Sequence, residues 1–174
     1  DRFDRLNMAL RSITGQETFH WDDMAIGLSG LQGIEHLVRT DLEGPLDTGM
    51  LMATLLRKAL AEGVLVRSGA HVTHMEESSA HVAIQLKDGA RIQAGRVVVC
   101  TNGYTPALLA DLPVTPARGQ VLLTAPITGL RLKGTFHYDE GFYYFRDHGG
   151  GVLLGGGRNL DVAGETTAEE GTTP

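Results

Sequence analysis

The sequence is poor in cysteine and in basic residues. Cys100 is the only cysteine, so the chain forms no internal disulfide, which suits a reducing compartment and predicts a cytoplasmic protein. Lysine and arginine total 15 against 21 acidic residues, and the formal net charge is −6. A nucleic-acid-binding protein would show a basic face, so nucleic acid is not an expected partner. No apolar run approaches the ~20 residues of a membrane helix, so no membrane span is expected.

The sequence also lacks the common cofactor and catalytic motifs. The stretch 149–157 is rich in glycine, but it contains a strand and no helix follows it, so it is not a dinucleotide fingerprint. Its glycines indicate either a tight turn with a packed strand end or close approach of the backbone to a ligand. His71 and His74 have opposite strand parity and diverge, and we expect no metal site. No Gly-x-Ser-x-Gly elbow or zincin motif is present, so the motifs identify no catalytic residue.

Short apolar segments separated by turn residues fill the middle of the chain. Residues 71–76 and 81–87 alternate apolar and polar side chains, and Lys87-Asp88-Gly89 is a hairpin turn signal, which together predict a hairpin layer with one wet face. Residues 64–66 and 97–100 are continuous apolar runs. We expect them to be strands buried on both faces, with Cys100 as a core thiol.

Helical periodicity appears in two places. Residues 3–13 carry apolar side chains at helical spacing, and Asp47 is a suitable N-cap for a second helix that ends before Gly63. The stretch 16–32 has no clean period, and we expect a loop or irregular strand with Trp21 as a packing anchor. Residues 35–39 are expected to form a short strand.

The last third of the chain predicts antiparallel strands. Pro116 and Pro126 bracket a strand at 120–123, and aromatic residues on both sides of the turn 139–141 predict a hairpin. The tail after Leu160 is polar and expected to be mobile. The fold class expected is mixed α/β: a partial α/β lobe with an inserted β-hairpin layer, and an antiparallel-sheet lobe.

Two groups of residues are candidate ligand contacts. Arg146 ends the aromatic strand expected at Phe142–Arg146, where a guanidinium could pair with a carboxylate while the rings exclude water. The alternative is a solvated surface arginine. Tyr143 and Tyr144 point to opposite strand faces, so only one of them can share a pocket with a given ligand.

The second group consists of two turns. Asn102 and Gly103 follow an expected strand end, where ligands bind in open α/β sheets, although an ordinary strand-to-helix turn would look the same. In the stretch Arg118-Gly119-Gln120, a glycine between polar side chains could admit a planar ligand, or the stretch could simply begin an edge strand.

Four stretches resemble, in order and approximate spacing, the FAD-dependent D-amino-acid oxidase superfamily, which includes glycine and sarcosine oxidases and amino-acid dehydrogenases. They are EGPLDTGMLMATLLRKALAEGVLV, VVVCTNGYTPALL, PVTPARGQVLL and GFYYFRDHGGGVLLGGGRNLD. The resemblance implies a FAD-dependent oxidoreductase that acts on the C–N bond of an amine or amino acid, with hydride transfer to the flavin and imine hydrolysis. The chain would be an internal fragment, inactive alone, because the family's glycine-rich unit lies outside it.

The resemblance also implies a division of the chain and roles for its residues. Residues 1–40 would belong to the substrate lobe or a connecting helix, 41–112 to the FAD-binding lobe and 113–174 to the antiparallel substrate lobe. Arg146 would bind the substrate carboxylate, with Tyr144 and Tyr143 beside it. The cofactor-binding residues implied are Val72, Asn102, Gly103, Arg118, Gly119 and Gln120. A non-catalytic ligand-binding or scaffolding domain is the alternative, and a nicotinamide-linked reductase is a third possibility.

Overall fold

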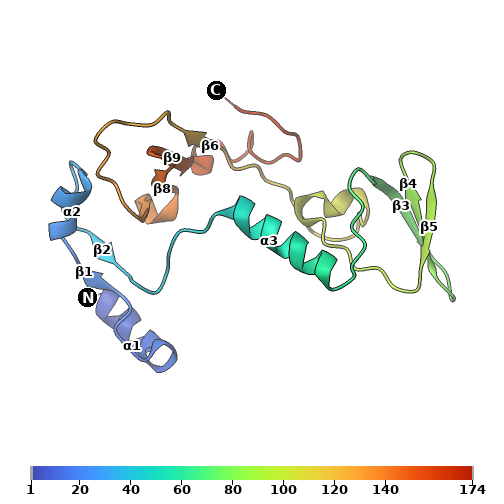
Figure 1. Ribbon diagram of the computed structural model, residues 1–174, viewed down its shortest axis with the longest axis horizontal. Coiled ribbons are helices and arrows are strands. Elements are labelled where there is room, and N and C mark those ends of the chain that lie inside the picture. The colour runs from blue at the N-terminus through green and yellow to red at the C-terminus, as the bar shows by residue number, and fades with distance from the viewer. Residues whose placement is uncertain (1, 174) are drawn as a thin grey trace. The chain divides into compact units, whose positions relative to one another are not determined.

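The chain folds into two compact units, and each is described by itself. The computed structural model describes residues 2–173 and is drawn in Figure 1. Unit 1 comprises Asp1–Asp47 and Gln120–Gly157, and unit 2 comprises Thr48–Gly119 and Arg158–Pro174. Within residues 2–173, no helix combines the length and apolar character needed to cross a membrane.

The first part of unit 1 is a helix with a small two-stranded sheet. Helix α1 spans Arg2–Thr14, β1 spans His20–Trp21, α2 spans Met24–Ser29 and β2 spans Val38–Arg39, and β1 pairs antiparallel with β2. Helix α1 confirms the helix predicted from the amphipathic pattern. Gly15, with φ of 72°, follows its last residue and terminates the helix. Helix α2 was not predicted, because its six residues are too short for a period to show.

The second part of unit 1 is a four-stranded antiparallel sheet with the order β6-β9-β8-β7. Strand β6 spans Val121–Leu123, β7 Thr135–Tyr138, β8 Tyr143–His148 and β9 Gly151–Gly156, with the 3-10 turn η2 at Asp139–Gly141. The predicted hairpin around this turn is confirmed by the register Tyr138↔Tyr143. The strand expected between Pro116 and Pro126 is β6.

Unit 2 contains a long helix and a three-stranded antiparallel meander. Helix α3 spans Thr48–Ala61, and strands β3 (Val72–Glu77), β4 (Val82–Leu86) and β5 (Arg91–Ala94) pair in sequence order. The 3-10 helices η1 (Asn102–Ala107) and η3 (Arg158–Leu160) complete the unit. Leu86, at the end of β4, is only 2% exposed. The predicted hairpin layer and the turn at Gly89, with φ of 89°, are confirmed.

The two buried strands expected at 64–66 and 97–100 do not form. Neither segment has strand geometry, Leu65 is 97% exposed, Val98 is 85% exposed and Cys100 is exposed rather than a core thiol. An apolar run becomes a strand only where a neighbouring strand takes up its backbone hydrogen bonds, and no described segment pairs with either run. The prediction of a mixed α/β fold class is confirmed, but all the sheets in the described chain are antiparallel. The division into lobes stays a prediction.

Candidate functional site

Arg146 lies in the middle of β8 rather than at a strand end. It pairs with Thr135 of β7 on one side and Leu153 of β9 on the other, so neighbouring strands hold its backbone on both sides. The side chain is half-buried, and its Nη1 donates a hydrogen bond to the Leu46 carbonyl oxygen at 3.2 Å. It forms no ion pair with an Asp or Glu of residues 2–173.

The acidic neighbour of Arg146 is engaged elsewhere. Asp147 points to the opposite face of β8, because successive side chains alternate along a strand. Its Oδ1 accepts from the Gly134 N–H at 3.0 Å, and its Oδ2 lies 3.1 Å from Lys133 Nζ. The pKa of Asp147 is lowered from its ordinary value. The hydrogen bond from the Gly134 N–H is the largest cause, and the hydrogen bond from Lys133 is the next. Asp147 therefore does not neutralise Arg146.

Tyr144 shares the sheet face of Arg146, and Tyr143 does not. Tyr144 and Arg146 are two residues apart on β8, and Gly155 of β9 pairs with Tyr144. A Cβ at Gly155 would overlap the Tyr144 ring, so the ring lies directly over this glycine. His137 of β7 lies opposite Tyr144, with ring centroids 6.5 Å apart. One face of β7, β8 and β9 thus carries Arg146, Tyr144 and His137, and we call it the guanidinium face.

Asn102, Gly103 and Arg118 meet in a pocket of unit 2. The pocket has a volume of about 600 Å³. Asn102 has a left-handed φ of 45°, and a Cβ on Gly103 would lie 3.4 Å from Pro116 Cβ, so this turn approaches the Pro116 segment closely. Its lining residues come from η1, from the segment before β6 and from the C-terminal tail: Asn102, Gly103, Tyr104, Val114, Thr115, Pro116, Ala117, Arg118, Thr167, Ala168, Glu169, Glu170 and Gly171.

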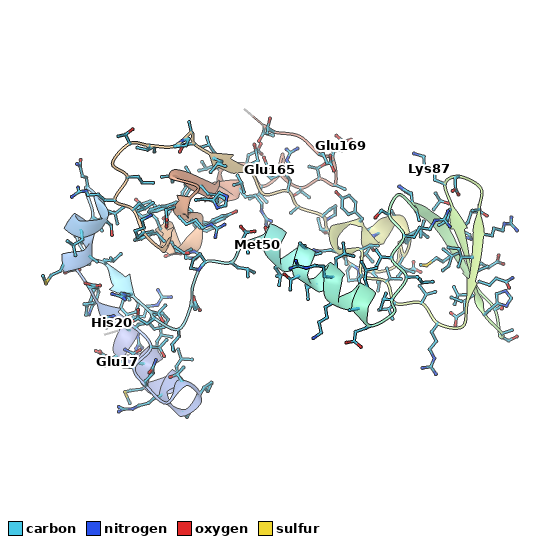
Figure 2. All side chains as sticks on the ribbon, viewed as in Figure 1. Glu17, His20, Met50, Lys87, Glu165 and Glu169 are labelled. Atoms are coloured by element: carbon cyan, nitrogen blue, oxygen red, sulfur yellow. The ribbon has the colours of Figure 1, made fainter. Side chains whose placement is uncertain are left out.

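The polar tail, expected to be mobile, packs against Arg118. Arg118 Nε donates to Glu165 Oε2 at 2.9 Å, and the Arg118 N–H donates to the Glu165 carbonyl oxygen at 2.8 Å. Glu165 is only 4% exposed, and the Thr173 hydroxyl donates to its other carboxylate oxygen. Figure 2 labels Glu165 and Glu169 on this tail. The hydrogen bond that Arg118 donates to Glu165 raises the pKa of Arg118 above its ordinary value, so the guanidinium stays charged.

Three of the implied cofactor residues do not line this pocket. Val72 begins β3, opposite Leu86 and beside a bulge in the ladder. Gly119 lies just beyond Arg118 and lines no wall, and Gln120 belongs to unit 1. Sequence reasoning missed the role of Glu165, because a Thr/Glu/Gly-rich tail carries no sign of which carboxylate becomes buried. It also missed His137, which the parity of the predicted hairpin could have placed beside Tyr144.

The described residues form a mixed α/β fold with a ligand-sized pocket in unit 2 and a sheet face in unit 1 on which Arg146 has no acidic partner among residues 2–173. Comparison with protein families gives the family: the sequence model described as FAD dependent oxidoreductase matches residues 7–173, and the chain belongs to this family, the D-amino-acid oxidase superfamily. FAD is therefore the cofactor of the full-length protein. A search of curated proteins found no match.

Proposed function

We propose that the full-length protein oxidises the C–N bond of an amino acid or a related amine that carries a carboxylate. Arg146 supports this substrate class most directly. It is a half-buried guanidinium beside Tyr144, it uses one N–H group on the Leu46 carbonyl, and its acidic neighbour Asp147 faces the other way. A guanidinium in this setting is suited to pair with a carboxylate through two parallel hydrogen bonds.

Tyr144 would order the same face around a bound carboxylate. Its ring is held over Gly155 on the sheet face that carries Arg146, where its hydroxyl would be presented to a ligand. His137 would border the ligand on the β7 side. Tyr143, which the resemblance implies as a second contact, belongs to the other face and is not part of this proposal. In this role Arg146 and Tyr144 bind and orient the substrate.

The pocket of unit 2 fits the flat ring end of FAD better than its diphosphate. Arg118 is already paired with Glu165, and Glu169 and Glu170 also line the pocket, so a diphosphate would meet carboxylates. A neutral planar ring, in contrast, meets no charge conflict in the pocket that the Asn102-Gly103 turn and Pro116 border. We therefore assign ring contacts to Asn102, Gly103 and Arg118. When bound, FAD supplies the two-electron acceptor for oxidation of the amine to an imine, which water then hydrolyses.

Anaerobic reduction of the flavin tests the proposal in the full-length protein loaded with FAD. Each amino acid is compared with the amine that lacks its carboxylate, and bleaching of the yellow flavin is followed. We expect the amino acid to be the better substrate, because only it can pair with Arg146. In Arg146→Met, KM for the amino acid should rise about 10- to 100-fold, since a hydrogen bond to a charged group contributes roughly 1.5–3 kcal/mol.

Matched measurements separate binding of the carboxylate from general damage. KM for the carboxylate-free amine should be unchanged in Arg146→Met, and Arg131→Met, another arginine of unit 1, should leave both substrates unaffected. If no amine or amino acid bleaches the flavin, the protein is not an amine oxidoreductase, and a non-catalytic binding domain becomes the better description. If KM rises equally for both substrates in Arg146→Met, Arg146 does not bind the carboxylate.

A further inference from the structure

A second pocket, in unit 1, has a lining that the proposed function does not use. It has a volume of about 230 Å³ and is bordered by α1, by the segment that leads into β1, and by β1 and β2. Its lining residues are Phe3, Asp4, Asn7, Glu17, Phe19, His20, Trp21 and Val38. None of them belongs to the guanidinium face. Figure 2 shows Glu17 and His20 close together in this part of the chain.

Three aromatic rings form one side of the lining. The Phe3 ring meets the Trp21 ring edge-on, with centroids 5.3 Å apart and planes at 85°. On its other side it lies 6.2 Å from the Phe19 ring, at 55°. All three residues line the pocket, and the faces of Trp and Phe rings attract a cation. Trp21 remains 53% exposed, so the indole is accessible from solvent.

The remaining lining is negative in character. Asp4 and Glu17 both border the pocket, and no lysine or arginine is among the lining residues. An anionic ligand is therefore disfavoured. Although Asp4, Glu17 and His20 all border it, no three His, Cys, Asp or Glu side chains in the described part of the chain come together as metal ligands. The chemistry points away from a metal ion and towards an organic cation.

Asn7 fixes the shape of this pocket before any ligand arrives. Its Nδ2 donates to Glu17 Oε1 at 3.1 Å and to the Phe19 carbonyl oxygen at 2.7 Å. Its Oδ1 accepts from the Thr18 and Phe19 N–H groups at 3.0 and 2.8 Å. One side chain of α1 thus holds both the carboxylate of Glu17 and the backbone that carries the Phe19 ring. Pre-organisation of this kind lowers the entropic cost of binding.

We propose that this pocket of Phe3, Phe19 and Trp21, with Glu17, binds a small organic ammonium ion. The rings contact the alkyl groups and the positive charge, and the Glu17 carboxylate balances that charge. The volume suits a headgroup of a few carbon atoms rather than a drug-sized molecule, for which pockets start near roughly 300 Å³. The inference does not rest on the proposed function, since it concerns different residues and needs no flavin.

Trp21 supplies the readout, because it is the only tryptophan of the chain. Choline is titrated into the 174-residue protein while tryptophan fluorescence is recorded, and 3,3-dimethyl-1-butanol, in which carbon replaces the charged nitrogen, serves as the neutral isostere. We expect a saturable fluorescence change with choline and a response at least tenfold weaker with the isostere. An equal response to both compounds would show an apolar site and overturn the proposal, as would the absence of a saturable response to choline.

Glu17→Gln tests the role of the carboxylate. Glutamine keeps an oxygen that can accept from Asn7, so the pocket retains its shape, and circular dichroism checks that the fold is intact. Loss of one exposed charge should raise the Kd for choline about fivefold. The matched control is Glu43→Gln, which makes the same charge change in unit 1 at a residue outside the pocket and should leave Kd unchanged. An unchanged Kd in Glu17→Gln, or an equal loss in both variants, overturns the proposal.

Discussion

Gly155 shows how one missing side chain shapes the guanidinium face. The Tyr144 ring occupies the space that a Cβ at position 155 would fill, and the two residues are register partners on β8 and β9. The φ of Gly155 is not in the left-handed region, so the requirement for glycine here comes from space and not from backbone strain. Any side chain at this position must push the Tyr144 ring away from its place beside Arg146.

We expect Gly155→Ala to lower the free energy of unfolding by about 1–3 kcal/mol, the usual cost of inserting a methyl group into occupied space. In the full-length enzyme it should also raise KM for an amino acid. Urea denaturation measures the first effect and steady-state kinetics the second. Gly44→Ala is the control, because a Cβ there meets nothing within 4 Å. A variant as stable as the parent would mean that the Tyr144 ring moves freely.

Sequence reasoning succeeded for single residues where strand parity determines the answer. The aromatic run before Arg146 placed it on a strand, and alternation placed Tyr143 and Tyr144 on opposite faces, as the register confirms. It could not show that Arg118 is held by Glu165, 47 residues away, because nothing local marks that pair. It also could not show that Asp147, next to Arg146, is committed to Gly134 and Lys133.

The short elements of unit 1 depend on a clamp between Asp23 and the segment that leads into β2. Asp23 precedes α2 without capping it, and its carboxylate instead accepts from the Leu37 N–H at 2.9 Å and lies 3.0 Å from His36 Nδ1. The hydrogen bond to His36 lowers the pKa of Asp23, and the same bond raises the pKa of His36. Trp21 packs edge-on against the His36 ring, at 5.4 Å between centroids.

This clamp predicts a pH window. Asp23 contributes stability above its ordinary pKa of 3.8 and loses it as the pH falls through its lowered value in the fold. His36 contributes stability below its ordinary pKa of 6.5 and loses it as the pH rises through its raised value. The clamp is therefore complete between pH 3.8 and 6.5.

An NMR titration of the His36 ring measures this coupling directly. We expect a midpoint above 6.5 in the parent protein and a return towards 6.5 in Asp23→Asn, which removes the charge that favours the imidazolium. Asp22→Asn serves as the control, because Asp22 pairs with Arg39 instead. An identical midpoint in all three proteins would show that the contact does not persist in solution.

Whole strands were predicted correctly where a segment pairs with the next segment in sequence, and wrongly where the pairing strand would have to come from a distant part of the chain. The hairpins β3–β4 and β7–β8 are closed by local turns, so alternation and turn residues were sufficient to predict them. The apolar runs at 64–66 and 97–100 could form strands only by pairing with strands distant in sequence. An apolar pattern does not show whether such a partner strand exists. The family assignment therefore depends on the match over residues 7–173 and not on those two strands.

The chain as a whole buries few large apolar side chains. Among the described residues, Leu86 and Leu132 are the buried apolar side chains, one in each unit, whereas α3 leaves Leu55, Leu56 and Leu60 exposed. Stability in unit 2 should accordingly be concentrated in the meander β3–β5 that surrounds Leu86, and the apolar runs on either side of it should contribute little.

Two leucine substitutions in unit 2 test this distribution. Leu86→Ala should lower the free energy of unfolding by about 2–5 kcal/mol, because it leaves a cavity at a side chain that is 2% exposed. Leu65→Ala removes the same atoms from a side chain that is 97% exposed. It should change the free energy of unfolding by no more than about 0.5 kcal/mol. Urea unfolding followed by circular dichroism gives both values. If Leu65→Ala proves as costly as Leu86→Ala, residues 64–66 are packed in solution, and the buried strand that their apolar pattern predicts does form.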